Sequence, residues 1–361
     1  AGWKQVADWI AEDIVAGKAM SSAPLPNWVF DGRDGVHGAG GSFSPVRNAN
    51  VARSTNPVYG RQRFPDPLVG EKFSQGRTLF ENDGVRLWAD EGDDIAVVGF
   101  KTKLHTVSDH VLSGLQEAIA IAERDFRGLV IWQSKEPFSA GADLAGALGL
   151  LQAGDVAGFE AMVANFQATS QRIKYAQVPV VAAVRGLALG GGCEFQMHAA
   201  RTVFGLESYI GLVEAGVGLI PAGGGSKEFA GRAAALAAKT ATPGEVFPFL
   251  QPVFQTIAMA RVAKSAIEAV DLGFAREQDI VLFHPGELLF VAIGQARAAA
   301  TAGYAPPPRL QDVPVAGRNG IANFEMVLVN MREGGMISAH DYRVARSAAV
   351  ALCGGEVETG A

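Results

Sequence analysis

The residues best suited to chemistry lie in one short stretch, where the carboxylate of Glu194 follows three consecutive glycines at positions 190–192. Glycine has no Cβ atom, so the backbone of such a stretch can lie directly against a ligand. The apolar sequence from Cys193 onward predicts a helix that starts here, and the first N–H groups of a helix have no partner within it. We therefore expect free N–H donors, the positive end of a helix dipole and a carboxylate to face one ligand.

A buried strand leads the chain into this turn. Residues 178–184 are apolar and rich in β-branched side chains, and Pro179 stands at their entry, where its missing N–H does least harm. The preceding sequence predicts two further strands and two helices, at 95–100, 129–133, 108–122 and 157–175 respectively.

The order of these elements predicts an α/β fold. Strand, helix, strand, helix and strand with short links form a largely parallel sheet with helices packed on it. Ligands of such sheets bind beyond the carboxyl ends of the strands. We therefore expect the site in the loops 134–143 and 185–192, which leave those ends.

Length, composition and charge exclude several classes of protein. The chain has 361 residues, of which 48% are hydrophobic and 19% charged, so it is globular with room for one large domain or two smaller ones. A formal net charge of −6 without a Lys/Arg cluster argues against nucleic acid or an anionic membrane as partner. Two cysteines are too few for a disulfide framework, and neither a membrane-spanning stretch nor a secretory leader is evident. We expect a cytoplasmic protein.

The first eighty residues differ from the rest. Residues 3–17 have apolar side chains at helical spacing and predict a short amphipathic helix ended by Gly17. From Ser21 to Gly76 the sequence is dense in Gly, Pro, Ser, Asn and Arg, yet it is too aromatic for a free linker, so we expect an extended segment lying on a protein surface. The chain is thus divided into an N-terminal helix with an extended segment, a core with the site and a mostly helical C-terminal region, at 1–80, 81–230 and 231–361.

Several residues that could do chemistry are interpreted as structural. Asp143 is expected to cap a helix. Cys193 lacks a Cys/His/Asn constellation and is expected to be a small buried residue. The six histidines show no metal-ligand spacing, so no metal site is expected. Residues 223–225 are glycines without the Lys-Ser/Thr ending of a phosphate-binding loop, and they predict a turn before a helix.

Three motifs together resemble a known family. They are Phe-Ser-Ala-Gly-Ala-Asp at 138–143, the strand and glycine turn at 182–194, and Gly-Leu-Ile-Pro-Ala-Gly-Gly-Gly at 218–225. In order and separation they resemble the crotonase superfamily, whose type member is enoyl-CoA hydratase, over about residues 85–300. The resemblance implies a spiral of ββα units, a trimeric core in many members, and a coenzyme A thioester that enters as substrate, with no separate cofactor. The expected fold is thus an α/β crotonase-type spiral with an N-terminal extended segment and a C-terminal helical region.

The resemblance also implies which backbone atoms meet the substrate. Negative charge develops on the thioester oxygen during the reaction, and two N–H donors, the oxyanion hole, would hold it. The resemblance places these donors at Ala140 and Gly191. Further substrate contacts are expected at the small residues beside them, which are Ser139, Gly141, Ala142 and Gly190.

Two carboxylates are implied as acid and base. Glu194 matches the Gly-Gly-Gly-Cys-Glu motif directly. Glu214 stands seven residues before Pro221, where the hydratases of the family have a second glutamate. Counting forward from Phe204 leads instead to Glu207, and we favour Glu214 because the glycine-rich motif after it is the better anchor.

The activity implied is that of an enoyl-CoA hydratase in fatty-acid β-oxidation. An enoyl-CoA isomerase, which needs one carboxylate, and a non-catalytic acyl-CoA-binding part of a larger enzyme are the alternatives. The extended front end is similar to that of a crotonase domain that follows a hydroxyacyl-CoA dehydrogenase module in a multifunctional fatty-acid oxidation protein. We therefore expect a homo-oligomer or association with such a module.

Overall fold

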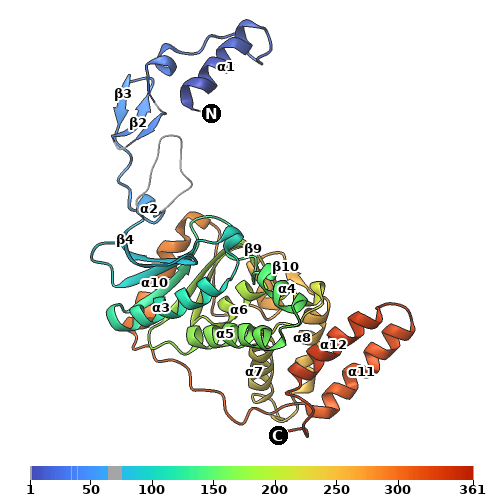
Figure 1. The fold of residues 1–361 in the computed structure, drawn as a ribbon. Coiled ribbons are helices and arrows are strands. Elements are labelled where there is room, and N and C mark those ends of the chain that lie inside the picture. The colour runs from blue at the N-terminus through green and yellow to red at the C-terminus, as the bar shows by residue number, and fades with distance from the viewer. Residues whose placement is uncertain (1, 34, 39, 64–74, 361) are drawn as a thin grey trace. The chain divides into compact units, whose positions relative to one another are not determined.

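A computed structural model describes residues 2–33, 35–38, 40–63 and 75–360 of this chain (Figure 1). The chain divides into two compact units, residues 1–75 and 76–361, and each is described by itself.

The first unit is built from short elements. It contains the helices α1 (Trp3–Val15) and α2 (Pro57–Gly60), the 3-10 turn η1 (Asn27–Phe30), and an antiparallel sheet of β1 (His37–Gly38), β2 (Gly41–Ser44) and β3 (Ala49–Val51). Aromatic rings hold it together, since Trp28 stacks on Trp3 at 6.4 Å and contacts Phe43 at 5.3 Å. The helix expected at 3–17 is confirmed. The segment expected to be extended has short regular elements in its described part, while its residues 64–74 lie outside the described residues.

The second unit is organised around an eight-stranded sheet. Its strands run in the order β10-β9-β8-β7-β6-β5-β4, with β11 paired to β9. Their bounds are β4 (Arg77–Glu81), β5 (Val85–Ala89), β6 (Ile95–Phe100), β7 (Gly128–Trp132), β8 (Val180–Leu189), β9 (Arg201–Gly211), β10 (Val262–Ala263) and β11 (Ile280–Leu282). The strands β6 to β9 are parallel, as expected, whereas β4, β5 and β6 are antiparallel because their links are too short for a crossover.

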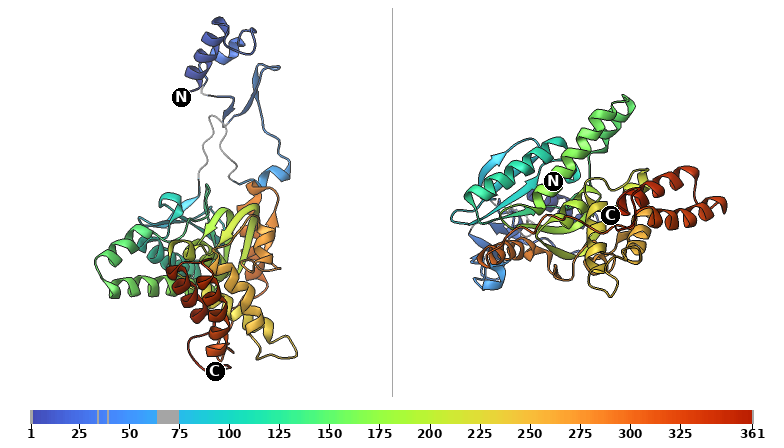
Figure 2. Two further views of the ribbon diagram at one scale, coloured as in Figure 1. Left: turned by 90° about the vertical axis from the view of Figure 1, so that its right-hand side faces the viewer. Right: turned by 90° about the horizontal axis from the view of Figure 1, so that it is seen from below.

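Helices cover both faces of this sheet (Figure 2). One face packs against α3 (Asp109–Asp125) and α6 (Gly191–His198), and the other against α10 (Leu288–Thr301). The helix α5 (Val156–Lys174) packs against α3 and α6. Successive residues of β6, β7 and β8 are consequently almost all buried, which explains why these strands are continuous apolar runs rather than alternating ones.

The strand that leads to the glycine turn is longer than expected. It continues past residue 184 to Leu189, because a register shift between Val184 and Gly186 lets residues 186–189 pair with β9 again. Gly186 has a φ of 64°, which favours glycine at this irregularity. The predicted loop 185–192 is therefore reduced to a sharp turn at Gly190, with α6 starting at the next residue.

The C-terminal part is mostly helical, as expected. It contains the helices α7 (Gly225–Ala237), α8 (Phe247–Ala258), α9 (Ala266–Asp271), α11 (Gly317–Glu333) and α12 (Ala339–Leu352) and the 3-10 turn η4 (Pro285–Glu287). Three short elements of the core complete the unit, namely α4 (Leu144–Gln152) and the 3-10 turns η2 (Lys103–His105) and η3 (Glu214–Val217). The helix α12 packs against α7, α8 and η3, and so supports the segment that contains Glu214. In the described ranges, no helix combines the length and the apolar character needed to cross a membrane.

Candidate active site

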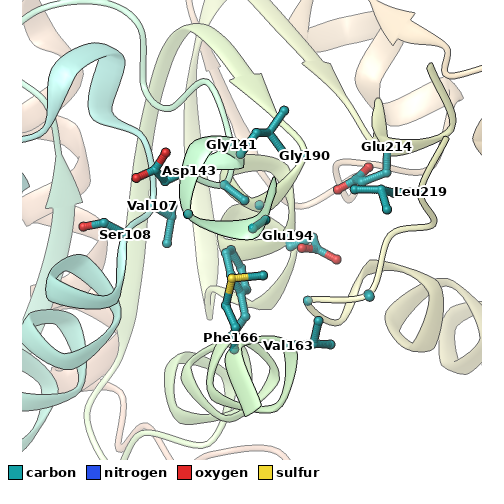
Figure 3. Close-up of a pocket in the computed structure, with 18 of the residues that line it drawn as sticks. Val107, Ser108, Gly141, Asp143, Val163, Phe166, Gly190, Glu194, Glu214 and Leu219 are labelled. Carbon is teal, nitrogen blue, oxygen red and sulfur yellow. The ribbon is translucent and has the colours of Figure 1, made fainter. Parts of the chain in front are cut away.

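A cavity of about 410 Å³ opens at the carboxyl ends of the central strands (Figure 3). Its lining residues come from five parts of the chain, within 107–112, 140–147, 159–166, 190–194 and 213–223. The parallel strands place the first turns after β7 and β8 side by side at this edge, as the order of elements predicted.

Glu194 lies on the first turn of α6 and is only 2% exposed. Its Oε1 accepts a hydrogen bond from the N–H of Gly225 at 2.8 Å, and the N–H groups of Gly223 and Gly224 also favour its charged form. A Cβ atom on Gly223 would lie 2.2 Å from Oε2 of Glu194, so only glycine lets the chain come this close. The glycines at 223–225 are confirmed as a turn before a helix, and the structure adds that this turn is a cradle for a carboxylate of the same protein.

Glu214 lines the same cavity from η3 (Figure 3). Its Oε2 is buried and has no hydrogen-bond partner in the part of the chain that the structure describes. Burial and the charge of Glu194 together raise the pKa of Glu214 to about 8. Burial raises the pKa of Glu194 to about 7, against the opposing effect of its three N–H donors. Two carboxyl groups with pKa values raised toward neutral pH therefore line one cavity.

The hydrogen bonds at the 134–143 loop correct the predicted role of Ala140. Its N–H donates to the carbonyl of Leu104 at 3.1 Å, so it is not free for a substrate oxygen, although Ala140 does line the cavity. On the same loop, the N–H of Ala142 finds no acceptor among the described residues, and neither does that of Gly191 at the start of α6. Sequence reasoning missed Ala142 as a donor because the partner of Ala140 lies 36 residues earlier in the chain.

The two free N–H groups belong to loops that touch. A Cβ atom on Gly141, whose φ is 99°, would lie 3.0 Å from the carbonyl oxygen of Leu189 and 3.5 Å from the nitrogen of Gly191. Gly190 adopts a φ of 50°, which turns the chain from β8 into α6. Because only glycines fit at this crossing, the donors of Ala142 and Gly191 come to neighbouring positions on the cavity wall.

Residues 90–242 match the family model described as Enoyl-CoA hydratase/isomerase. This region of the chain, residues 90–242, is therefore a crotonase-superfamily domain. Among relatives, it is 35% identical over 283 residues to a probable 3-hydroxyacyl-CoA dehydrogenase of Bacillus subtilis (strain 168), covering 78% of this chain and 35% of that protein. It is 32% identical over 193 residues to a putative fatty acid oxidation complex trifunctional enzyme of Rickettsia felis, covering 51% of this chain and 26% of that protein. The chain thus spans about a third and a quarter of the lengths of these two relatives.

Solved structures include an enoyl-CoA hydratase from Bacillus anthracis that aligns with 74% of this chain and 90% of its own. The TM-score of that alignment is 0.48 and the sequence identity 18%.

Ser139 is the second correction to the site expected for this crotonase domain. Its side chain is fully buried and does not line the cavity. The hydroxyl donates to the carbonyl of His105 at 2.7 Å and accepts the N–H of Gly141 at 3.1 Å. Ser139 therefore shapes the loop that presents Ala142 instead of contacting a ligand.

The rest of the cavity is an apolar wall, of which the sequence predicted only the helix at 157–175 and the motif at 218–225. It is formed by α5 and the segment before α7, through Phe159, Met162, Val163, Phe166, Leu219 and Ile220. The ring of Phe166 stacks on that of Phe195 with centroids 5.0 Å apart. The ring of Phe166 also packs directly against the glycine turn, since a Cβ on Gly191 would lie 2.3 Å from it.

Asp143 and Cys193 have the structural roles expected of them from the sequence. Asp143 caps α4 by accepting the N–H of Ala145 at 3.1 Å. Cys193 is fully buried, and burial raises the pKa of its thiol, so it is no nucleophile. Glu207 is exposed on β9 and does not line the cavity, which favours Glu214 as the second carboxylate. Within the described ranges, no three His, Cys, Asp or Glu side chains gather as metal ligands.

Proposed function

We propose that this crotonase domain adds water across the double bond of 2-enoyl-CoA thioesters in fatty-acid β-oxidation. The observation that carries the proposal is the presence of two carboxyl groups with raised pKa values, Glu194 and Glu214, in one cavity. Addition of water needs one group to take a proton from the water and one to deliver a proton to the α-carbon. The relatives named as fatty acid oxidation enzymes support the thioester as substrate class.

The thioester oxygen is assigned to the amides of Ala142 and Gly191. Neither N–H group has a hydrogen-bond partner among the described residues, both residues line the cavity, and α6 adds the positive end of its dipole at Gly191. As the enolate-like state forms, the charge on the oxygen grows, and loss of one such donor typically costs about 3–4 kcal/mol.

The two carboxyl groups have different surroundings, which suggests different roles. Three N–H groups favour the charged form of Glu194, so it is the base that takes a proton from water. Oε2 of Glu214 has no hydrogen-bond partner in the described ranges, and burial and the charge of Glu194 raise the pKa of this carboxyl, so Glu214 keeps its proton and is the acid toward the α-carbon. After one turnover the proton taken by Glu194 replaces the one given by Glu214, through the water or product between them.

Substitution of each glutamate tests the proposal. Glu194→Gln and Glu214→Gln should each lower the hydration rate by about a hundredfold or more, with acyl-CoA binding retained. Loss of 2-enoyl-CoA absorbance gives the rate, and calorimetric titration with a saturated acyl-CoA gives the binding. Unchanged turnover in either variant removes that residue from the mechanism.

The substrate offered in the same assay separates the alternatives. Conversion of 3-enoyl-CoA into 2-enoyl-CoA, with no hydration and with Glu214→Gln fully active, would make this domain an isomerase. Tight thioester binding without turnover at any chain length would make it a binding module.

We propose further that the chain works with a 3-hydroxyacyl-CoA dehydrogenase module. The relative from Bacillus subtilis has that name, and this chain covers 35% of it. Hydration of a 2-enoyl thioester produces a 3-hydroxyacyl thioester, which is the substrate class in that name. All lining residues lie between 107 and 223, so the catalytic region proposed is 81–230. Sedimentation of the purified chain, alone and with a separate dehydrogenase, distinguishes a homo-oligomer from a mixed complex.

A further inference from the structure

One buried histidine that the reaction above does not use lies directly behind Glu194. His198 is the last residue of α6, one helical turn after Glu194, and its side chain is completely buried. Its Nδ1 lies 2.7 Å from the carbonyl oxygen of Glu194. A carbonyl only accepts hydrogen bonds, so Nδ1 must carry the hydrogen in this contact.

The other face of the imidazole meets the glycine cradle. A Cβ atom on Gly224 would lie 2.8 Å from Cε1 and 3.0 Å from Nε2 of His198, and Gly224 has a φ of 129°. Nε2 is buried and has no hydrogen-bond partner among the described residues. The ring is therefore wedged between the helix that contains Glu194 and the turn whose N–H groups hold the Glu194 carboxylate.

Charged groups from two helices surround this ring. Glu228 of α7 lies 3.9 Å from Nε2 and is itself paired with Lys174 of α5 at 2.6 Å and with Arg232 at 3.3 Å. Burial lowers the pKa of His198 to about 4, and Lys227 and Lys174 act in the same direction, while Glu228 opposes them. The imidazole is thus neutral at physiological pH and its Nε2 is unprotonated when Nδ1 donates.

We propose that His198 is a positioning residue for Glu194: its Nδ1–H fixes the end of α6, and its ring sets the distance from α6 to the glycine turn at 223–225. That distance decides how many N–H groups reach the carboxylate and therefore how strongly its charged form is favoured. The inference rests on the proposed function only in that Glu194 is the base of the hydration.

Two substitutions separate the hydrogen bond from simple packing. His198→Asn can place an amide N–H near the position of Nδ1, whereas His198→Leu fills a similar volume without a donor. We expect His198→Leu to lower kcat by roughly tenfold to a hundredfold, as small misplacements of reacting groups do, with KM nearly unchanged. The acidic limb of its pH–rate profile should move to higher pH, because fewer N–H donors then favour the charged carboxylate. His198→Asn should recover most of kcat and the original profile.

Ser170→Ala is the matched control. Ser170 faces the same interior, with its Cβ 3.5 Å from the Cβ position of Gly224, and its buried hydroxyl has no hydrogen-bond partner in the described part of the chain. Its removal should leave kcat and the pH profile unchanged. Equal impairment of the Asn and Leu variants, or an unaffected Leu variant, overturns the proposal.

A measurement on the wild-type protein keeps the proposal testable if the variants do not fold. The ¹⁵N spectrum of the histidine side chains should show a protonated Nδ1 and a bare Nε2 for His198 throughout pH 5.5–8. His105, whose Nδ1 lies 2.6 Å from the carbonyl oxygen of Pro137, is expected to have the same tautomer, so the two rings must be told apart. The His198 signals are assigned by their loss from the spectrum of a folded His198 variant or, failing that, by nuclear Overhauser contacts with Gly224, which lies against this ring. An imidazolium or the opposite tautomer at this residue would overturn the inference. This result needs no turnover, so it stands apart from Glu194→Gln, whose full activity would refute the proposed hydration instead.

Discussion

Gly223→Ala is the sharpest perturbation of the cradle around Glu194. The added methyl carbon would lie 2.2 Å from Oε2 of Glu194 and 2.5 Å from a ring carbon of Phe166. Both distances are far shorter than any contact between non-bonded atoms, and both neighbours are buried. The carboxylate must therefore move away from the turn or the turn away from it, and at least one N–H contact is lost.

The size of the effect follows from the hydrogen bonds involved. A hydrogen bond to a charged group contributes about 1.5–3 kcal/mol. One pKa unit corresponds to about 1.4 kcal/mol, so loss of one N–H should raise the pKa of Glu194 by about one to two units. The base is then protonated over more of the pH range, and the acidic limb of kcat should move to higher pH by that amount. Displacement of the carboxylate should also lower kcat at its optimum by roughly a hundredfold.

The assay is the hydration rate of a 2-enoyl-CoA between pH 5 and 9, with circular dichroism as a check that the variant is folded. Gly294→Ala is the matched control, because a Cβ there meets no atom within 4 Å and the residue lies within α10, away from the cavity. That control should keep the activity and gain about 0.5–1 kcal/mol of helix stability. A folded Gly223→Ala protein with the wild-type profile would refute the idea that the glycine turn tunes Glu194.

Three further predictions concern stability. The pKa of Glu214 is raised in the folded state, so the folded protein keeps a proton that the unfolded chain loses above its ordinary pKa of 4.5. The free energy of unfolding therefore falls as the pH rises from 4.5 to about 8. Glu214→Gln should raise Tm at pH 8 more than at pH 5 in calorimetric scans, and an equal change at both would contradict this. The pKa of Glu228 is lowered to about 2, and this carboxylate lies among Lys174, Arg232 and His198. Glu228→Gln should therefore lower the free energy of unfolding by about 3–5 kcal/mol in urea at pH 7. The difference should shrink as the pH falls toward 2, where the wild-type carboxylate is protonated as well. Phe166→Ala should lower the free energy of unfolding by about 3–5 kcal/mol and also lower kcat, because the ring lies against Gly191. A variant with lower stability and full kcat would show that the ring does not position the site.

The sequence alone was enough to predict the main elements of the core and the place of Glu194 at the start of a helix. The strand at 95–100 and the helices near 109–125 and 156–174 lie where apolar spacing placed them, because such periodicity records which faces of a local segment are buried. Glu194 could be identified because a strand, a glycine turn and a helix start adjoin it within one continuous stretch.

The contacts of each polar group in the site depend on the tertiary structure. The turn at 223–225 cradles a carboxylate about thirty residues earlier. The carbonyl of Leu104 accepts the N–H of Ala140, whereas the N–H of Ala142 has no acceptor in the described part of the chain. The continuation of β8 to Leu189 likewise depends on pairing with β9. Local sequence patterns report burial and backbone preference, whereas a hydrogen bond between distant segments depends on how the whole chain packs.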